Sequence, residues 1–230
     1  MNIPTVRPRL SIRLHLLVAV LLIVVLGIAP APSAHAASIV VTTTVDSLDA
    51  DGTCSLREAI IAVNTQATVD TCDGAGSMHI DLPAGTFMLS LDAPSSAEDT
   101  PSIFDLDISH DLTLVGAGDK QTIIDADHLD RVLEVITGTV ALHDLTLQNG
   151  SGHSGGAIAN CGVLSLKNVI LTHNFASADG GAVQNYGTMY LESSRVNNNQ
   201  SLVFGGAFDN HGTLELVDSV VAEKIGRAHV

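Results

Sequence analysis

The sequence is poor in aromatic residues. It contains no Trp, two Tyr and five Phe, so aromatic residues make up only 3% of the chain. A core of helices packed around large aromatic rings is therefore not expected. The 20 Gly, together with many Val, Ile, Leu, Thr and Asn, favour numerous short strands joined by tight turns.

Basic residues are also scarce, and three of the ten lie together near the N-terminus. Arg7, Arg9 and Arg13 precede an apolar run over residues 16–29, which the small-residue sequence Ala-His-Ala follows. A basic segment, an apolar segment and an A-x-A site in this order are typical of a signal peptide. The apolar run of 14 residues is shorter than the roughly 20 that cross a bilayer. We therefore predict a cleaved signal peptide over residues 1–36 rather than a membrane anchor.

Acidic residues dominate the chain after this segment. All 25 Asp and Glu follow residue 36, together with seven of the ten Lys and Arg, so the exported chain has a net charge of 7 − 25 = −18. Such a surface repels nucleic acid, anionic lipid and polyuronates, so nucleic acid is not an expected partner. The charge suits a secreted or cell-surface protein, and no membrane span is predicted in the exported part.

Only three cysteines are present. In an oxidising compartment Cys54 and Cys72, which lie 18 positions apart around a segment rich in Gly and Asp, are the natural disulfide pair. Cys161 is then left over. It occupies a repeat position that holds Tyr186 and His211 elsewhere, so we predict a free, partly exposed thiol.

An internal repeat organises the C-terminal half. Three segments that begin at Gly155, Gly180 and Gly205 align without gaps at a period of 25 residues. After the shared Gly-Gly-Ala, the repeated positions are Asn160, Asn185 and Asn210, then Gly162, Gly187 and Gly212, followed by alternating apolar residues. A period of 25 with alternating apolar residues predicts one coil of a β-solenoid per repeat. The L-x-x-L-x-L-x-x-N frame of a leucine-rich horseshoe is absent.

The repeated Asn and Gly positions have structural interpretations. Paired glycines that open each unit are suited to corners where the backbone needs a positive φ. The repeated Asn either stacks as a ladder of side-chain amides from coil to coil or occupies a left-handed turn before the following Gly. The sequence leaves both interpretations of the Asn open.

The segment CSLREAIIAVN predicts a short helix ahead of the coils. Ser55 and Glu58 form a capping box, and the apolar side chains fall on one helical face; they are Leu56, Ala59, Ile60 and Val63. We expect this helix to cover the N-terminal end of the solenoid core. Arg57 within it is expected to pair with an acid of the first coil.

Several blocks of this chain resemble a known family. They are CSLREAI at 54–60, PAGTFMLSL at 83–91, DLDISHDLTLVGAG at 105–118 and TIIDADHLDRVLEV at 122–135, followed by the Gly-Gly-Ala units. Together they are similar to the CSLREAI-domain proteins that bacteria export. The resemblance implies an all-β, right-handed parallel β-helix of the pectate-lyase-like kind and a secreted or cell-surface location. It implies no settled activity.

The predicted domain organisation has four parts. After the signal peptide, residues 37–102 form an N-terminal cap and residues 103–223 form the coils. The last residues, 224–230, leave the repeat, and Ile-Gly-Arg-Ala-His-Val is a translation of a common sequencing adapter. We therefore expect a non-native tail and a natural protein that continues.

Catalysis would need charged residues that the repeat does not bring into register. A uronate lyase uses a Lys or Arg as base, and the basic residues before the tail occupy unrelated positions. They are Arg57, Lys120, Arg131, Lys167 and Arg195. A glycoside hydrolase needs two carboxyl groups about 5 to 10 Å apart. Candidate pairs are Asp105 with Asp107, Asp125 with Asp127, and Asp209 with Asp218.

Metal chemistry has little support in the sequence. The histidines fall at different places in the repeat, so no metal triad is expected; they are His143, His153, His173 and His211. The one cofactor left open is calcium, with Asp125 and Asp127 as ligands beside corner carbonyls.

We therefore predict a binding or adhesion scaffold without catalytic residues, whose partner is a glycan or a surface protein. The alternative is a polysaccharide-active lyase or hydrolase on the same fold. An exposed cluster of acids with one basic residue would favour that enzyme, and its absence would favour the scaffold.

Overall fold

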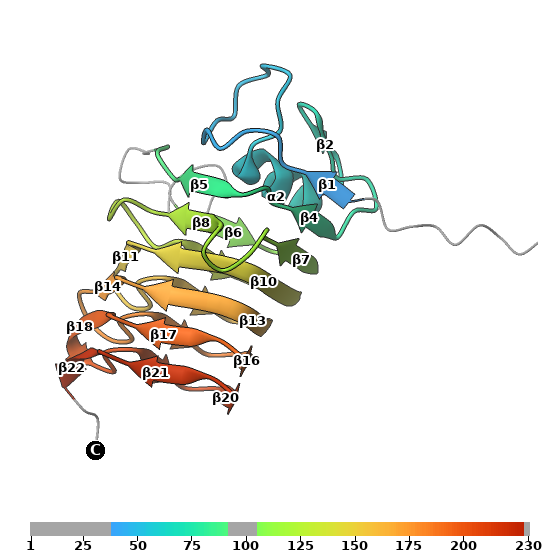
Figure 1. The fold of residues 1–230 in the computed structure, drawn as a ribbon. Coiled ribbons are helices and arrows are strands. Elements are labelled where there is room, and N and C mark those ends of the chain that lie inside the picture. Colours follow the sequence, from blue (N-terminus) through green and yellow to red (C-terminus); the bar gives the residue numbers. More distant parts are fainter. Residues whose placement is uncertain (1–37, 92–104, 228–230) are drawn as a thin grey trace, which may run out of the picture. The chain divides into compact units, whose positions relative to one another are not determined.

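The computed structural model describes residues 38–91 and 105–227, which belong to one compact unit (Figure 1). The predicted signal peptide lies outside the described residues. No helix in the described ranges is long and apolar enough to cross a membrane.

The fold is a parallel β-solenoid, which confirms the predicted β-helix class. The largest sheet has eleven strands. They are β1 (Ser38–Val40), β4 (His79–Asp81), β5 (Gly85–Met88), β7 (Leu112–Val115), β8 (Thr122–Asp125), β10 (Thr139–Gln148), β13 (Val163–Thr172), β16 (Thr188–Glu192), β17 (Arg195–Asn197), β20 (Thr213–Val217) and β21 (Val220–Ala222).

Two smaller parallel sheets complete the later coils, and a short hairpin lies outside them. The five-stranded sheet contains β6 (Leu106–Ile108), β9 (Leu133–Val135), β12 (Ile158–Asn160), β15 (Val183–Asn185) and β19 (Phe208–Asn210). The four-stranded sheet contains β11 (Ser151–Gly152), β14 (Phe175–Ala176), β18 (Gln200–Phe204) and β22 (Ile225–Arg227). The hairpin pairs β2 (Thr68–Val69) with β3 (Cys72–Asp73). Strand β22 lies in the predicted non-native tail, whose origin stays a prediction.

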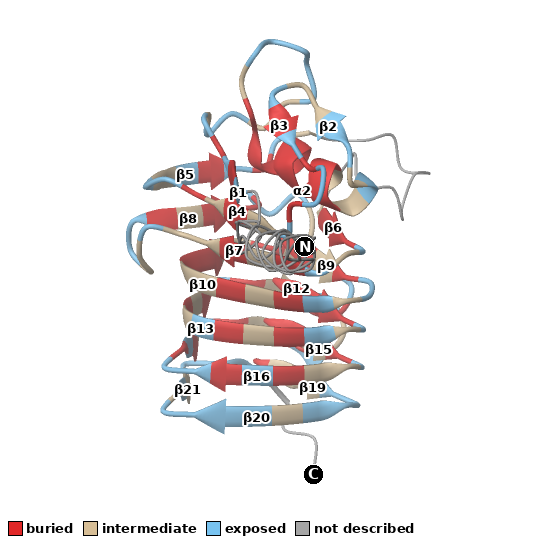
Figure 2. Cartoon of the chain, turned by 90° about the vertical axis from the view of Figure 1, so that its right-hand side faces the viewer, coloured by how far each residue is buried: buried red, intermediate tan, exposed pale blue. Residues whose placement is uncertain are grey.

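Corresponding residues of the repeats stack in register. Leu164 pairs with Met189, and Met189 pairs with Leu214. The first two side chains are fully buried, and Leu214 is partly buried against the same core. Figure 2 shows this loss of burial in the last coil, at β20. The predicted inward stack is therefore confirmed.

Residues with positive φ make the corners of each coil. Gly155, Gly180 and Gly205 have φ of 69°, 66° and 61°, which confirms the predicted glycine corner. Two further corners use non-glycine residues, and sequence analysis missed them. One consists of Asp144, Asn168, Ser193 and Asp218, and the other of His128, Asn149, His173, Asn198 and Glu223. Asn, Asp and His are the side chains that best tolerate this left-handed conformation.

The repeated Asn residues form a ladder. The Asn160 side-chain amide donates to Asn185 Oδ1 at 2.7 Å, and the Asn185 amide donates to Asn210 Oδ1 at 2.6 Å. None of the three has a positive φ. The ladder is therefore the correct interpretation and the left-handed turn is not. A second buried pair, Asn174 and Asn199, repeats the arrangement at 3.0 Å.

The repeated glycines allow this close stacking. A Cβ atom on Gly162 would lie 2.6 Å from the carbonyl oxygen of Gly138. On Gly187 or Gly212 it would lie 2.0 Å from a glycine carbonyl oxygen of the preceding coil. Their role is close backbone approach, since none of the three has a positive φ.

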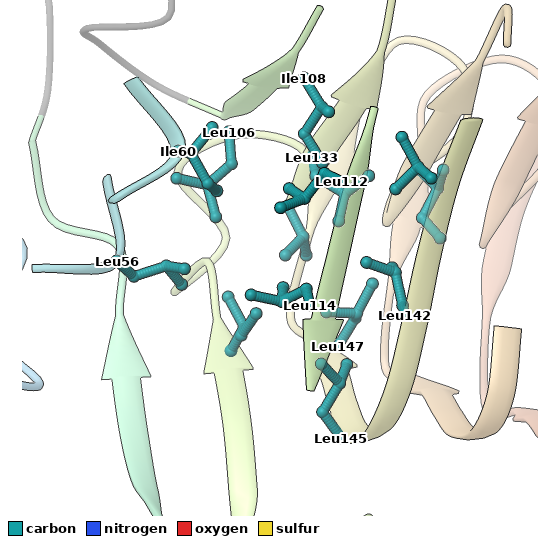
Figure 3. Packing of buried hydrophobic residues seen from close by; sticks show 14 of the residues in the cluster. Leu56, Ile60, Leu106, Ile108, Leu112, Leu114, Leu133, Leu142, Leu145 and Leu147 are labelled. Atoms are coloured by element: carbon teal, nitrogen blue, oxygen red, sulfur yellow. The ribbon is translucent and has the colours of Figure 1, made fainter. Parts of the chain in front are cut away.

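The predicted N-terminal helix is present as α2 (Leu56–Thr65). Both hydrogen bonds of the Ser55 and Glu58 capping box form. Helix α2 packs on β6, and Figure 3 shows Leu56 and Ile60 beside the leucines of the first coils. A disulfide joins Cys54 to Cys72 with a Cα–Cα distance of 5.2 Å, and Cys161 is free and exposed. Both cysteine predictions are confirmed.

Among the described residues, the acidic partner of Arg57 is Asp46 of the cap, whereas an acid of the first coil was predicted. Its Nε lies 2.8 Å from Asp46 Oδ1, and its Nη2 donates to Asp46 Oδ2 at 3.0 Å. Asp46 follows β1 and so belongs to the predicted cap. The first coil instead provides the carbonyl oxygen of Asp105, which accepts from Nη1 at 3.2 Å. The guanidinium thus links the helix to the cap loop and to the coil backbone.

Parallel pairing begins earlier than residue 103, the predicted boundary. Strand β4 pairs with β7, placing His79 beside Thr113, and β5 pairs with β8, placing Gly85 beside Thr122. These spacings of 34 and 37 residues are longer than the 25-residue period of the later coils. A self-comparison at period 25 therefore cannot detect these strands, although they extend the same sheet.

Candidate functional site

Three acidic side chains meet on the five-stranded sheet. Asp107 of β6 pairs in register with Glu134 of β9, and Asp105 immediately precedes β6. One ligand atom from each lies within 4.8 Å of the others. Arg131 Nη1 donates to Asp105 Oδ2 at 3.2 Å and to Glu134 Oε2 at 2.8 Å. The structure therefore contains a cluster of acids with one basic residue, which we call the acid cluster.

Burial changes the chemistry of this cluster. Asp107 is only 4% exposed, whereas Asp105 and Glu134 are half-buried. Burial raises the pKa of Asp105 to about 7, with repulsion from Asp107 adding to the rise and attraction from Arg131 opposing it. A carboxyl group that is partly protonated at neutral pH has the chemistry of an acid catalyst.

The same cluster also joins the cap to the first coil. Besides the Arg57 bond to the Asp105 carbonyl, Asn64 of α2 donates to the carbonyl oxygen of Asp107 at 2.7 Å. The backbone N–H of Ser109 donates to Asn64 Oδ1 at 3.0 Å. Ion-pair networks that hold elements together perturb pKa values as catalytic sites do. The position of the cluster favours this structural role.

The raised pKa of Asp105 predicts that stability falls as pH rises. Between its ordinary value of 3.8 and about 7, the folded protein holds a proton that the unfolded chain has released. The free energy of unfolding should therefore decrease from about pH 4 to pH 7 and level off above. Asp105→Asn, which does not titrate, should flatten this decrease in urea titrations across that range. An identical pH dependence in the two proteins would contradict the prediction.

The other predicted acid pairs do not form catalytic arrangements. Asp125 is 7% exposed, and its carboxylate accepts hydrogen bonds from the side chains of Gln148 and Asn149 and from the N–H of Asp127, at 2.7 to 3.0 Å. It closes a corner. Asp209 lies on β19 beside His211, whereas Asp218 is a corner residue between β20 and β21, so these two are on different sheets.

The four histidines considered in the sequence lie at separate places in the fold. His143 is on β10, His153 follows β11, His173 is a corner residue, and His211 stacks on Tyr186 with centroids 5.0 Å apart. The one candidate metal-ligand cluster within the described ranges contains no histidine.

A groove runs along one corner of the coils, and sequence analysis did not find it. Its volume is about 500 Å³. Its lining is His128, Asn149, Ser151, His173, Asn174, Phe175, Asn198 and Gln200. These residues come from four successive coils and include no Asp, Glu, Lys or Arg. The sequence does contain polar residues at spacings of 24 and 25 positions, namely Asn149, His173 and Asn198. Because the residue type differs between them, they were not recognised as a repeated position.

Comparison with known proteins adds no relative to these observations. No protein family model, curated protein or solved structure matches this chain. The functional assignment therefore rests on the fold, the acid cluster and the groove.

The outer face of the eleven-stranded sheet carries scattered polar side chains. Ser165 pairs with Tyr190, and Tyr190 pairs with Glu215, all on the outward side. Lys167 Nζ lies 2.9 Å from Glu192 Oε1, with both side chains 53% exposed. This face provides control positions away from the groove.

Proposed function

We propose that this chain is an exported CSLREAI-type β-helix scaffold that binds a partner outside the cell or at its surface, without catalysis. The observation that carries the proposal is the neutral groove across four coils. Binding sites are concave and pair apolar contacts with a few polar groups, whereas hydrolysis or β-elimination needs charged residues in the cleft. The groove has an apolar ring and several polar side chains, and its lining contains no Asp, Glu, Lys or Arg.

Three further features support export. The disulfide between Cys54 and Cys72 suits an oxidising compartment. The strong negative charge suits a soluble extracellular surface. The CSLREAI segment forms the capping helix, a role consistent with the resemblance to bacterial exported proteins.

A second candidate function is glycoside hydrolysis, and one observation favours it. The acid cluster supplies close carboxyl groups, a raised pKa on Asp105 and one basic residue. The sequence-based criterion for an enzyme is an exposed cluster, and this cluster meets it only in part, because Asp107 is buried and Asp105 and Glu134 are half-buried. We rank it second because Arg131 bonds to two of the acids and the cap binds their backbone.

An activity assay separates the two functions. The exported chain is incubated with polygalacturonate, alginate and neutral plant and microbial glycans, with and without calcium, and unsaturated products and reducing ends are followed. We expect no product above that of a buffer blank. Turnover that Asp105→Asn abolishes, while the matched Asp209→Asn keeps it, would establish the hydrolase instead.

A further inference from the structure

We infer that the groove binds a neutral, hydroxyl-rich glycan strand lying along the coil axis. This inference rests on the proposed binding function and names the class of ligand. It follows from the arrangement of the lining side chains, their free hydrogen-bonding groups and their lack of charge.

Two rows of side chains border the groove. The first row consists of the corner residues His128, Asn149, His173 and Asn198, whose φ values of 55° to 61° give each the same backbone conformation. The second row consists of Ser151, Phe175 and Gln200, which pair in register on β11, β14 and β18. Successive members of a row are one strand spacing apart, about 4.8 Å. The groove therefore presents a repeating unit on the scale of one sugar ring.

The floor between the rows is held rigidly. Asn174 is 1% exposed, and its amide donates to Asn199 Oδ1 at 3.0 Å and to the carbonyl of Leu147 at 3.4 Å. Its own Oδ1 accepts from the N–H of Gly150 at 2.8 Å. A floor that is already hydrogen-bonded needs no reordering when a ligand binds, which favours affinity.

The border rows keep polar groups available. Asn149 donates its amide to Asp125, which leaves its carbonyl oxygen as an acceptor. His173 Nδ1 is 3.0 Å from Thr172 Oγ1, which leaves the other ring nitrogen, Nε2, available to a ligand. Within the described part of the chain, the side-chain amide of Gln200 has no hydrogen bond in the structure. Amides and imidazoles both donate and accept, as sugar hydroxyls do.

Charge and shape select among ligands. A polyanion meets no Lys or Arg in the lining and a strongly acidic protein around it. A cationic ligand finds no carboxylate in the lining. The half-buried ring of Phe175 offers an apolar surface to the C–H face of a sugar. A neutral glycan satisfies all of these conditions together.

Calorimetry with defined probes tests the inference. The probes are neutral hexamers of glucose, mannose and N-acetylglucosamine, with hexagalacturonate as the charged counterpart. We expect at least one neutral hexamer to bind and hexagalacturonate not to bind. His173→Ala combined with Gln200→Ala should weaken that binding at least tenfold, whereas Ser165→Ala combined with Tyr190→Ala should change it less than twofold. Thermal unfolding of both variants checks that they are folded.

The outcomes separate the inference from the proposed function. Failure of every neutral hexamer to bind, or binding that survives the groove variant, overturns the glycan assignment. If a surface protein binds at the groove instead, the scaffold stands and the ligand class is wrong. Cleavage of a bound hexamer overturns the proposed function itself.

Discussion

Replacing Gly187 by alanine should destabilise the protein by about 3 kcal/mol, the upper part of the range for overpacking a tight interior. The new Cβ would lie 2.0 Å from the carbonyl oxygen of Gly162. Because that atom is backbone, the two coils must separate, and separation weakens the hydrogen bond between Asn160 and Asn185. Urea unfolding followed by circular dichroism measures the loss.

Gly152→Ala is the matched control for this substitution. A Cβ at Gly152 would meet its nearest backbone oxygen at 3.1 Å, a distance that small shifts can relieve, and its φ is not positive. We expect a change under about 1 kcal/mol. Equal losses in the two variants would show that coil spacing is not set by the repeated glycine.

The second large effect is expected from Asp46→Ala. This change removes the Asp46 carboxylate from the Arg57 guanidinium, and the Arg57 side chain is fully buried. Removing one member of a buried ion pair typically costs about 3 to 5 kcal/mol. Asp46 also accepts hydrogen bonds from the N–H groups of Ser90 and Leu91, at 2.9 and 3.1 Å. Its loss should therefore loosen the cap, as measured by urea unfolding and by protection of α2 amides from hydrogen exchange.

An exposed ion pair on the coils is the control. Glu192→Ala removes the partner of Lys167, and both of these side chains are 53% exposed. Surface pairs contribute about 0 to 1 kcal/mol, so little change is expected. Burial of Asp46 opposes ionisation, but bonds and attraction from Arg57 still lower the pKa of this carboxyl. If Asp46→Ala behaved like Glu192→Ala, the cap would not depend on the Arg57 pair.

Features that recur at the period of 25 could be predicted from the sequence. The position of the Asn residues, the glycine corner and the inward Leu and Met stack all follow from that period, because identical residues in parallel register meet their own copies. The capping box and the disulfide join residues that are close in the sequence, so both could be predicted from a short segment without the repeat.

Features that depend on other spacings could not be predicted. Asp105 and Asp107 were a candidate pair in the sequence, but the acid cluster also needs Asp107 beside Glu134, a register of 27 residues that departs from the period. The groove needs corners where His and Asn substitute for each other, since the left-handed backbone rather than one side chain is what repeats. Strands β4 and β5 pair with β7 and β8 at spacings of 34 and 37 residues, and so these strands gave no repeat signal.

The ladder of Asn160, Asn185 and Asn210 also constrains how such a gene can change in length. Duplication or loss of 25 codons restores every neighbour relation, since each coil contacts only the coils beside it. A shift of one codon in a strand would turn its apolar residues outward and remove an amide from the ladder. Along the ladder the solenoid is therefore expected to lengthen by whole coils, each of which copies the surface of the preceding coil.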